Sequence, residues 1–319
     1  MQQDISSLYE LYLSRSDLRP LSLEFKRRAL ELFVAEFGNI PIGQVTAAIA
    51  EDFRTVLAKG RSKVTVNGYL SNFKPFFRWC QRRGRILEDP FLGVKPYKVE
   101  ERRLNKFSSH ELARLVKLCE TPLWLARLGF GLVGCRRGEM FNIVKGDIHL
   151  DDPQPHVLLS AKPDKEDGWE WVTKTHRLRY IALPEGIECG GVLLRFHDAI
   201  CECLKVKQPY PFVEPKYYRQ MMRLKSEGHL GAHDIADPTG NFQRSFVRIQ
   251  KLAGIEPIKR YHDLRRTFGT AAVAQYGLAK ATIALGNATA EITRRHYDVQ
   301  SPIAVVAEIS RMVRKCFNT

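Results

Sequence analysis

The stretch YHDLRRTFGT, residues 261–270, places His262 and Arg265 three positions apart in a segment that favours a helix. Side chains three apart lie roughly 60° from one another around a helix, so both can reach one object. An imidazole and a guanidinium directed at one point, with Arg266 beside them, suit an anion. A phosphate group is the first candidate, and the rest of the chain has to support it.

The charge of the chain favours a polyanionic partner. Its 319 residues include 50 Lys and Arg against 35 Asp and Glu, for a formal net charge of +15. Between Arg54 and Arg103 there are thirteen basic residues and only four acidic ones. Each basic side chain placed on a phosphate releases counterions, so this local excess favours nucleic acid over a merely well-solvated surface.

Cysteine usage and hydropathy predict a cytoplasmic protein. The seven cysteines form no CxxC pair, which is typical of reduced thiols. The first residues do not resemble a signal peptide, and no apolar run reaches the roughly 20 residues that span a bilayer. We therefore expect no contact with a membrane.

The pattern of elements predicts a mainly helical chain with a small antiparallel sheet. Residues 1–98 predict a helical domain, with helices over 20–38 (capped by Ser22), 42–60 and 62–84. Residues 99–106 are expected to be a linker, and 107–319 a second domain that opens on a capping box at Ser108 and Glu111. Three strands are predicted, over 156–160, 169–174 and 178–184, with helices resuming after Pro184 and a last amphipathic helix over 301–317.

The third helix is the most informative of the first domain. Its core-facing positions are Val66, Leu70, Phe73, Phe77 and Cys80. The opposite face is polar and basic, and Pro75 is expected to kink or loosen the helix. We predict a DNA-facing surface, with a solvated face as the alternative, and its candidate contacts are Arg61, Lys63, Asn67, Lys74, Arg78 and Arg82.

Four segments of the chain carry residues suited to phosphate chemistry. In chain order they are GCRRGE (134–139), VTKTHRLRYIALP (172–184), the HxxR pair of His262 and Arg265, and LGNATAEITRRHYD (285–298). Each segment alone is a weak signal, because such short patterns are common by chance.

Together and in this order, the four segments resemble the tyrosine recombinase, or phage integrase, family. That family begins with a helical core-binding domain containing a TvNxYLxxxxxFFxW helix, which TVNGYLSNFKPFFRW (65–79) matches closely. The resemblance covers about residues 20–316. It implies a two-domain DNA clamp, with a SAM-like core-binding domain and a catalytic integrase domain. It also implies a tetramer on double-stranded DNA with paired recombination sites in a bacterial nucleoid, and it leaves accessory DNA-bending proteins open.

The resemblance also assigns roles to individual residues. The family's first arginine falls on Arg136, the acid after it on Glu139, the β-hairpin lysine on Lys174, the HxLR box on His262 and Arg265, and the nucleophile on Tyr297. One position departs from the pattern, because Asn287 stands where His or Trp is usual. An amide can donate a hydrogen bond to a phosphate oxygen but cannot shuttle a proton, so we interpret Asn287 as a positioning group.

These residue types suit cleavage of a phosphodiester. Two guanidiniums can neutralise the non-bridging oxygens, on which charge grows in the transition state. A phenol with a pKa near ~10 needs a base, a role that fits His262, and the departing 5′-oxygen needs a proton, a role that fits Lys174. Attack by Tyr297 would leave a 3′-phosphotyrosine, so neither ATP, a metal ion nor another cofactor is expected.

Several alternatives stay open from the sequence. Tyr180, Tyr261 and Tyr276 also lie near the motifs and are interpreted as packing residues. His229 and His233 are spaced like a metal pair, but no acid or cysteine nearby completes a ligand set. A type IB topoisomerase would use the same chemistry, and a catalytically weakened DNA-binding relative would keep the fold alone.

Overall fold

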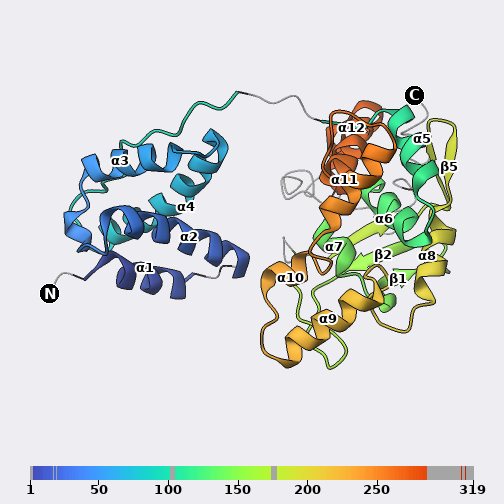
Figure 1. The fold of residues 1–319 in the computed structure, drawn as a ribbon, viewed down its shortest axis with the longest axis horizontal. Helices are drawn as coiled ribbons and strands as arrows, with labels where there is room; N and C mark the ends of the chain where they lie inside the picture. Colours follow the sequence, from blue (N-terminus) through green and yellow to red (C-terminus); the bar gives the residue numbers. More distant parts are fainter. Residues whose placement is uncertain are drawn as a thin grey trace. The chain divides into compact units, whose positions relative to one another are not determined.

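The structure is a computed structural model that describes residues 3–16, 18, 20–100, 105–173, 178–285, 310 and 313. The chain divides into two compact units, Met1–Arg102 and Arg103–Thr319 (Figure 1). We call them the first and the second unit. The division falls inside the segment 99–106, which was expected to be the linker.

The first unit is a helical bundle around an aromatic core. Its elements are α1 (Ile5–Ser14), α2 (Pro20–Phe37), the 3-10 helix η1 (Ile42–Gln44), α3 (Ala47–Ala58) and α4 (Lys63–Arg82). α4 packs against the three other α-helices, and its ring of Phe73 lies 5.4 Å from that of Phe53. All five α4 residues predicted to face the core are buried, so that prediction is confirmed.

Three expectations for the first unit differ from the structure. The helix α1 was not expected; the side chain of Asp4 caps it by accepting from the backbone N–H of Ser7 at 2.9 Å. α2 begins at Pro20, so Ser22 lies inside the helix instead of capping it. The segment 42–60 divides into η1 and α3, because the side chain of Thr46 accepts from the N–H of Ile49 and starts α3 there. α4 continues as one helix through Pro75, and the kink or loosening expected there stays a prediction.

The second unit is mainly helical. Its α-helices are α5 (Ser109–Leu118), α6 (Pro122–Leu132), α7 (Arg137–Phe141), α8 (Phe196–Leu204), α9 (Pro215–Ser226), α10 (Ala232–Ala236), α11 (Phe242–Leu252) and α12 (His262–Leu285), with the 3-10 helix η2 at Lys145–Asp147. The predicted capping box is confirmed, because Ser108 and Glu111 exchange backbone and side-chain hydrogen bonds at the start of α5. α6 packs against both α8 and α12.

The described residues of the second unit also form two small antiparallel sheets. β1 (Ile148–His149), β2 (His156–Leu159) and β3 (Arg179–Ala182) form one sheet in that order, and β4 (Ile187–Cys189) pairs with β5 (Val192–Leu194). The strands expected around 156–160 and 178–184 are thus confirmed.

A strand was expected over 169–174, but the described residues 169–173 do not form one. The segment contributes only an isolated bridge between Lys162 and Trp171. The reason is packing, because the ring of Trp169 is buried and stacks on Tyr210 at 3.9 Å. The prediction of a helix directly after Pro184 was also wrong, because the β4–β5 hairpin lies between Pro184 and α8. Of the predicted helix 301–317 only Ser310 and Val313 are described, and Val313 is buried in the core of the second unit.

Candidate active site

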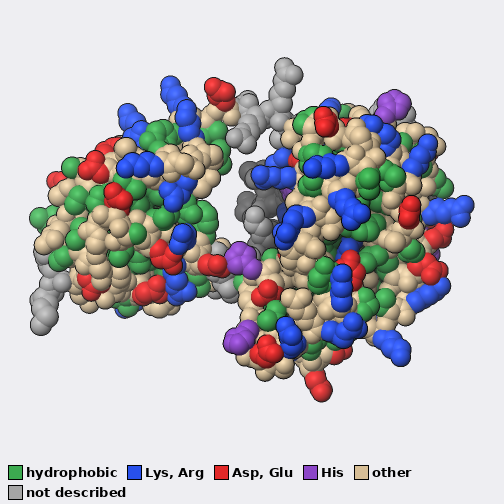
Figure 2. Space-filling model, in the orientation of Figure 1, with side chains coloured by type: hydrophobic (Ala, Val, Ile, Leu, Met, Phe, Trp, Pro, Cys, Tyr) green, Lys and Arg blue, Asp and Glu red, His purple; other side chains and the backbone are tan. Residues whose placement is uncertain are grey.

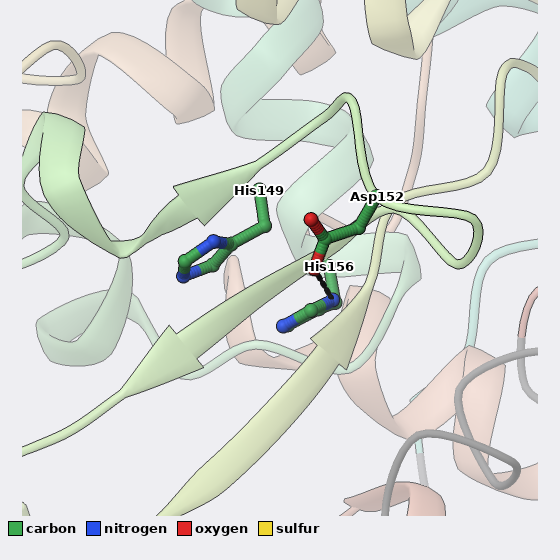
Figure 3. A group of neighbouring side chains, drawn as sticks. All are labelled: His149, Asp152 and His156. Carbon is green, nitrogen blue, oxygen red and sulfur yellow. Dashed lines mark ion pairs between the residues drawn. The ribbon is translucent and has the colours of Figure 1, made fainter.

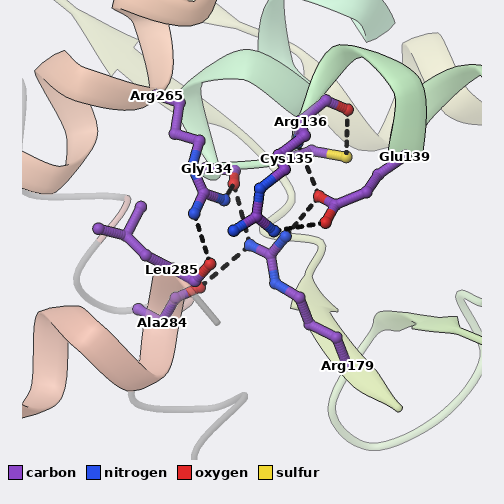
Figure 4. Close-up of polar contacts among 8 residues, drawn as sticks. All are labelled: Gly134, Cys135, Arg136, Glu139, Arg179, Arg265, Ala284 and Leu285. Carbon is purple, nitrogen blue, oxygen red and sulfur yellow. Dashed lines mark hydrogen bonds and ion pairs between the residues drawn. The ribbon is translucent and has the colours of Figure 1, made fainter. Parts of the chain in front are cut away.

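A glycine turn between α6 and α7 is the centre of the candidate site. Gly134 has φ +81°, a left-handed conformation that favours glycine. A Cβ atom there would lie 2.9 Å from the ring of Phe268 and 3.1 Å from Leu285, both of α12. The close approach brings the backbone carbonyl of Gly134 within reach of two arginines. That carbonyl accepts a hydrogen bond from Nη2 of Arg179 at 2.9 Å and another from Nη1 of Arg265 (Figure 4).

Arg136 follows this turn at the start of α7. Its backbone N–H and its Nη1 donate to the two carboxylate oxygens of Glu139, at 2.8 and 2.6 Å. The other strong partner of Glu139 is Arg179 at the start of β3, whose Nη1 lies 2.5 Å from Oε2. One carboxylate therefore orients two guanidiniums that come from different elements (Figure 4).

The predicted HxxR pair lies at the start of α12. Arg265 is 5% exposed, and its Nη2 donates to the carbonyl of Leu285 at 2.7 Å. α12 is broken at Gly277, whose φ of +82° is not helical, so Ala284 and Leu285 belong to its second part. Arg179 also reaches this second part, with Nη2 3.4 Å from the carbonyl of Ala284. We call Arg136, Arg179 and Arg265 the arginine cluster; Glu139 pairs with the first two, and the carbonyl of Gly134 links the last two.

The cluster is electrostatically crowded. Burial alone would raise the pKa of Glu139, but the positive charges of Arg179 and Arg136 outweigh it and lower the pKa to about 2. Burial, and then the charges of Arg179 and Arg136, lower the pKa of Arg265 to about 9. Three guanidiniums and one carboxylate carry a net positive charge, so a further anion would relieve the repulsion among them.

His262 stands next to this positive charge on the exposed side of α12. Partial loss of water around the ring, and then the positive charges of Arg265 and Arg266, lower the pKa of His262 below its ordinary value of 6.5. The imidazole is therefore mainly neutral at neutral pH. A neutral imidazole can accept a proton, which a general base requires.

The structure brings together four of the predicted residues, Arg136, Glu139, His262 and Arg265. Lys174, Asn287 and Tyr297 lie outside the described residues, as does the segment 286–309 to which the last two belong. Among the competing tyrosines, Tyr261 is buried and its hydroxyl donates to the carbonyl of Arg127, so its interpretation as a packing residue is confirmed.

Arg179 is the residue of the cluster that sequence reasoning missed. It belongs to the RYIALP strand that follows Lys174, and no motif of the resemblance assigns it a role. Its side chain is 10% exposed, which is unusual for an arginine. A signal did exist, because a basic residue at the start of an otherwise apolar strand rarely reaches the interior without a charged partner.

The predicted DNA contacts of the first unit fall into two groups. Lys63, Arg78 and Arg82 are exposed on α4. Asn67 is half-buried, with its amide bonded to both the N–H and the carbonyl of Tyr97 at 2.8 Å. Lys74 likewise donates to the carbonyl of Val94, and Arg61 to that of Leu57 at 3.5 Å. The second group therefore has internal contacts, and all six remain predictions as DNA contacts.

The second unit carries a further basic face, on α11. Arg244, Arg248 and Lys251 are exposed at positions i, i+4 and i+7, which share one side of a helix. The side chain of Gln243, at the start of α11, accepts from the N–H of Tyr261 at 3.3 Å, which places α11 beside the start of α12. Basic side chains lie over the α11 and α12 region in Figure 2. The spacing of these three residues is readable from the sequence alone, although no motif draws attention to it.

Solved structures of integrases have the same fold as this chain. Lambda integrase in a dimer bound to a COC′ core site matches with a TM-score of 0.67 at 15% identity, over 91% of this chain and 97% of that one. A lambda integrase tetramer bound to a Holliday junction gives 0.66 at 16% identity, over 89% and 77%. The Tn1549 transposon integrase in complex with a circular intermediate DNA gives 0.64 at 15%, over 97% and 99%. The fold expected from the resemblance to tyrosine recombinases is thus confirmed.

Comparison by sequence gives a shorter match. A protein of Escherichia coli (strain K12) that carries the name defective protein IntQ is 31% identical over 133 residues. The match covers 40% of this chain and about a third, 33%, of the length of IntQ. No family model matches the chain. None of the described helices is both long enough and apolar enough to cross a bilayer.

Proposed function

We propose that this protein is a site-specific DNA recombinase of the tyrosine class, which cleaves and rejoins strands through a 3′-phosphotyrosine. The observation that carries the proposal is the arginine cluster, in which Glu139 pairs with Arg136 and Arg179 while the carbonyl of Gly134 joins Arg179 to Arg265. Its net positive charge suits a phosphodiester, and His262 lies beside it with a lowered pKa. The shared fold with DNA-bound integrases supports the same assignment.

In this mechanism the guanidiniums act on the phosphate and the other residues move protons. Arg136 and Arg265 bind the non-bridging oxygens and stabilise the charge that grows on them during attack. His262 accepts the phenolic proton while the oxygen of Tyr297 bonds to phosphorus. The bond to the 5′-oxygen breaks, and Lys174 protonates that oxygen. Rejoining reverses these steps, with the 5′-hydroxyl as nucleophile.

The first test concerns the nucleophile. Tyr297→Phe should bind duplex DNA with unchanged affinity but form no covalent adduct on a nicked suicide substrate. Tyr180→Phe is the matched control, because Tyr180 is a half-buried residue of β3, and it should form the adduct normally. An adduct that persists in Tyr297→Phe would refute the assignment.

A second test concerns the acid. Lys174→Ala should cleave an ordinary phosphodiester slowly, because the leaving oxygen lacks a proton donor. Replacing the 5′-oxygen by sulphur supplies a leaving group that needs no proton, and cleavage should then recover. If the sulphur substrate is cleaved as slowly as the ordinary one, Lys174 has another role.

A third test concerns the DNA-facing surface of α4. Arg78→Ala and Arg82→Ala remove exposed charge without touching the internal contacts of Asn67 and Lys74. For every phosphate that is no longer neutralised, the slope of log K against log salt should become shallower by about 1. Arg28→Ala is the control, since Arg28 is 59% exposed on α2 and paired with Glu31. Equal slopes in all variants would mean that the exposed face of α4 does not contact DNA.

Assembly as a tetramer on paired sites belongs to the same proposal. It is supported by the fold shared with lambda integrase, which has been solved as a tetramer on a Holliday junction. Recombination between two plasmid-borne sites tests it, and relaxation of supercoiled DNA that lacks paired sites would instead indicate a type IB topoisomerase activity.

A DNA-binding protein with weakened catalysis is the second candidate function. Two observations favour it: Asn287 departs from the usual residue, and the relative IntQ is named as defective. Its signature is sequence-specific binding by the wild-type chain without any covalent adduct. Asn287→His should then restore cleavage if this position is what limits the chemistry.

A further inference from the structure

The hairpin formed by β1 and β2 holds three side chains with metal-binding groups. His149 and His156 are directly paired across the two antiparallel strands, and Asp152 lies in the turn that joins them (Figure 3). Each offers one ligand atom, and these atoms all lie within 4.8 Å of one another. Among the residues that the structure describes, no other group of three or more His, Cys, Asp or Glu side chains meets this condition.

We propose that His149, Asp152 and His156 bind a divalent transition metal ion, with Zn²⁺ as the best-suited ion. Two imidazoles and one carboxylate form a donor set that zinc accepts, with water in the fourth position. Calcium and magnesium prefer sites made of oxygen ligands, so this donor set disfavours them.

The surroundings of His156 favour ligation through one nitrogen. His156 is 3% exposed, and its Nδ1 lies 2.8 Å from the carbonyl of Gln154, to which it donates. That hydrogen bond keeps Nδ1 protonated and leaves the lone pair of Nε2 for a metal ion. Metal-binding histidines commonly have this kind of backbone partner on the other ring nitrogen.

The other two ligands can move toward the ion. The rings of His149 and His156 stack at 4.8 Å with an angle of 19° between them. A metal ion lies in the plane of each imidazole that binds it, so the half-buried ring of His149 must turn out of the stack. The side chain of Asp152 is 45% exposed in the turn, with Oδ2 3.8 Å from Nδ1 of His156, so it can follow. We therefore expect an adaptable site of moderate affinity.

The proposed metal site is separate from the arginine cluster. His156 is opposite Ala182 in the β2–β3 ladder, whereas Arg179 is opposite Leu159 at the other end of β2. Three residues of strand separate the two ends by about 10 Å. The ion would thus hold β1 to β2, remote from the phosphate chemistry, and the site can be tested without DNA.

The experiment is a titration of the full-length, tag-free, chelator-treated protein with Co²⁺, followed by visible absorption. We expect one equivalent to bind with new d–d bands, which Zn²⁺ then abolishes by displacement. His149→Gln and Asp152→Asn should each weaken binding at least about tenfold, since loss of even an outer partner typically costs 10–100-fold. His149 is only half-buried and the side chain of Asp152 is exposed, so these variants should fold even if His156→Gln does not.

The matched control is the double variant His229→Gln and His233→Gln. These histidines are also four apart but belong to no three-ligand group in the described structure. Their replacement should leave the Co²⁺ spectrum and affinity unchanged. The proposal is overturned if the wild-type chain shows no saturable one-to-one binding, or if the His149 and Asp152 variants bind as tightly as the wild type. Neither result depends on whether the chain cleaves DNA.

Discussion

The ionisation of Glu139 should make the free energy of unfolding of the second unit depend on pH between about pH 5 and pH 2. Its pKa is about 2 in the folded chain against an ordinary value of 4.5. In that window the unfolded chain binds a proton that the folded chain does not, so stability falls as the pH falls. A difference of 2.5 pKa units, from 4.5 to about 2, corresponds to about 3 kcal/mol. The contribution is nearly complete above about pH 5 and is lost as the pH falls to about 2.

Glu139→Gln should remove this contribution at every pH. The change leaves Arg136 and Arg179 without the carboxylate that they share, and breaking such a buried pair typically costs about 3–5 kcal/mol. The pKa and the buried-pair argument therefore give similar magnitudes. Because the cluster then carries more positive charge, phosphate or sulfate ions should stabilise the variant more than the wild type.

The measurement is urea unfolding followed by hydrogen exchange and mass spectrometry, which separates peptides of the two units. We expect the loss in peptides from residues 107–285 and no change in peptides from the first unit. The pH dependence between about 5 and 2 should be flatter in the variant than in the wild type. A loss below about 1 kcal/mol at pH 7, or one spread over both units, would refute the reasoning from the arginine cluster.

Three further changes test parts of the same site. Arg266→Gln removes a positive charge beside His262, so the pKa of His262 should rise. The acid limb of a plot of cleavage rate against pH should then move to higher pH, and an unmoved limb would exclude His262 as the titrating base. Gly134→Ala should destabilise the second unit by about 1–3 kcal/mol or more, because left-handed strain adds to the contacts with α12. Gly228→Ala, which is left-handed but meets nothing within 4 Å, should show only the strain in the same unfolding assay. Arg179→Lys should slow cleavage about 10²-fold and leave DNA affinity nearly unchanged, because one ammonium cannot span the three acceptors that the guanidinium of Arg179 holds in position. Equal single-turnover cleavage rates of the variant and the wild type would contradict this positioning role.

The parts of the fold that sequence reasoning predicted well have strong periodicity. α4 has twenty residues, a serine cap and an unbroken apolar stripe, and its predicted bounds and core face were close to those of the structure. The β4–β5 hairpin was missed because each strand has only three residues. Its turn did carry a readable signal, since Gly190 and Gly191 both have positive φ, as a two-residue hairpin loop requires.

The segment around Trp169 shows why local composition can mislead. Aromatic and β-branched residues favour strands, and residues 169–174 are rich in them. In the structure the indole of Trp169 donates to the side chain of Asn142 at 2.8 Å and stacks on Tyr210. Both partners are distant in sequence, so tertiary packing, which no local pattern encodes, decided the conformation.

The candidate site shows the same division between what was and was not predictable. Arg136, Glu139, His262 and Arg265 were assigned by resemblance to family motifs, and the structure brings all four together. The resemblance gave no reason to include Arg179, whose importance depends on β3 starting next to the turn at Gly134. That juxtaposition of segments 45 residues apart emerges only from the packed fold.

Two residues of the arginine cluster are joined through the same backbone groups. Arg179 and Arg265 share the carbonyl of Gly134 as an acceptor, and they also donate to the carbonyls of Ala284 and Leu285 in α12. Under the proposed function, Arg265 would bind the phosphate while Arg179 holds the same backbone carbonyl in place. Because the two arginines share acceptors, replacing both should cost much less than the sum of the single losses. Strict additivity in a double-mutant cycle on cleavage would mean that they act on the phosphate independently.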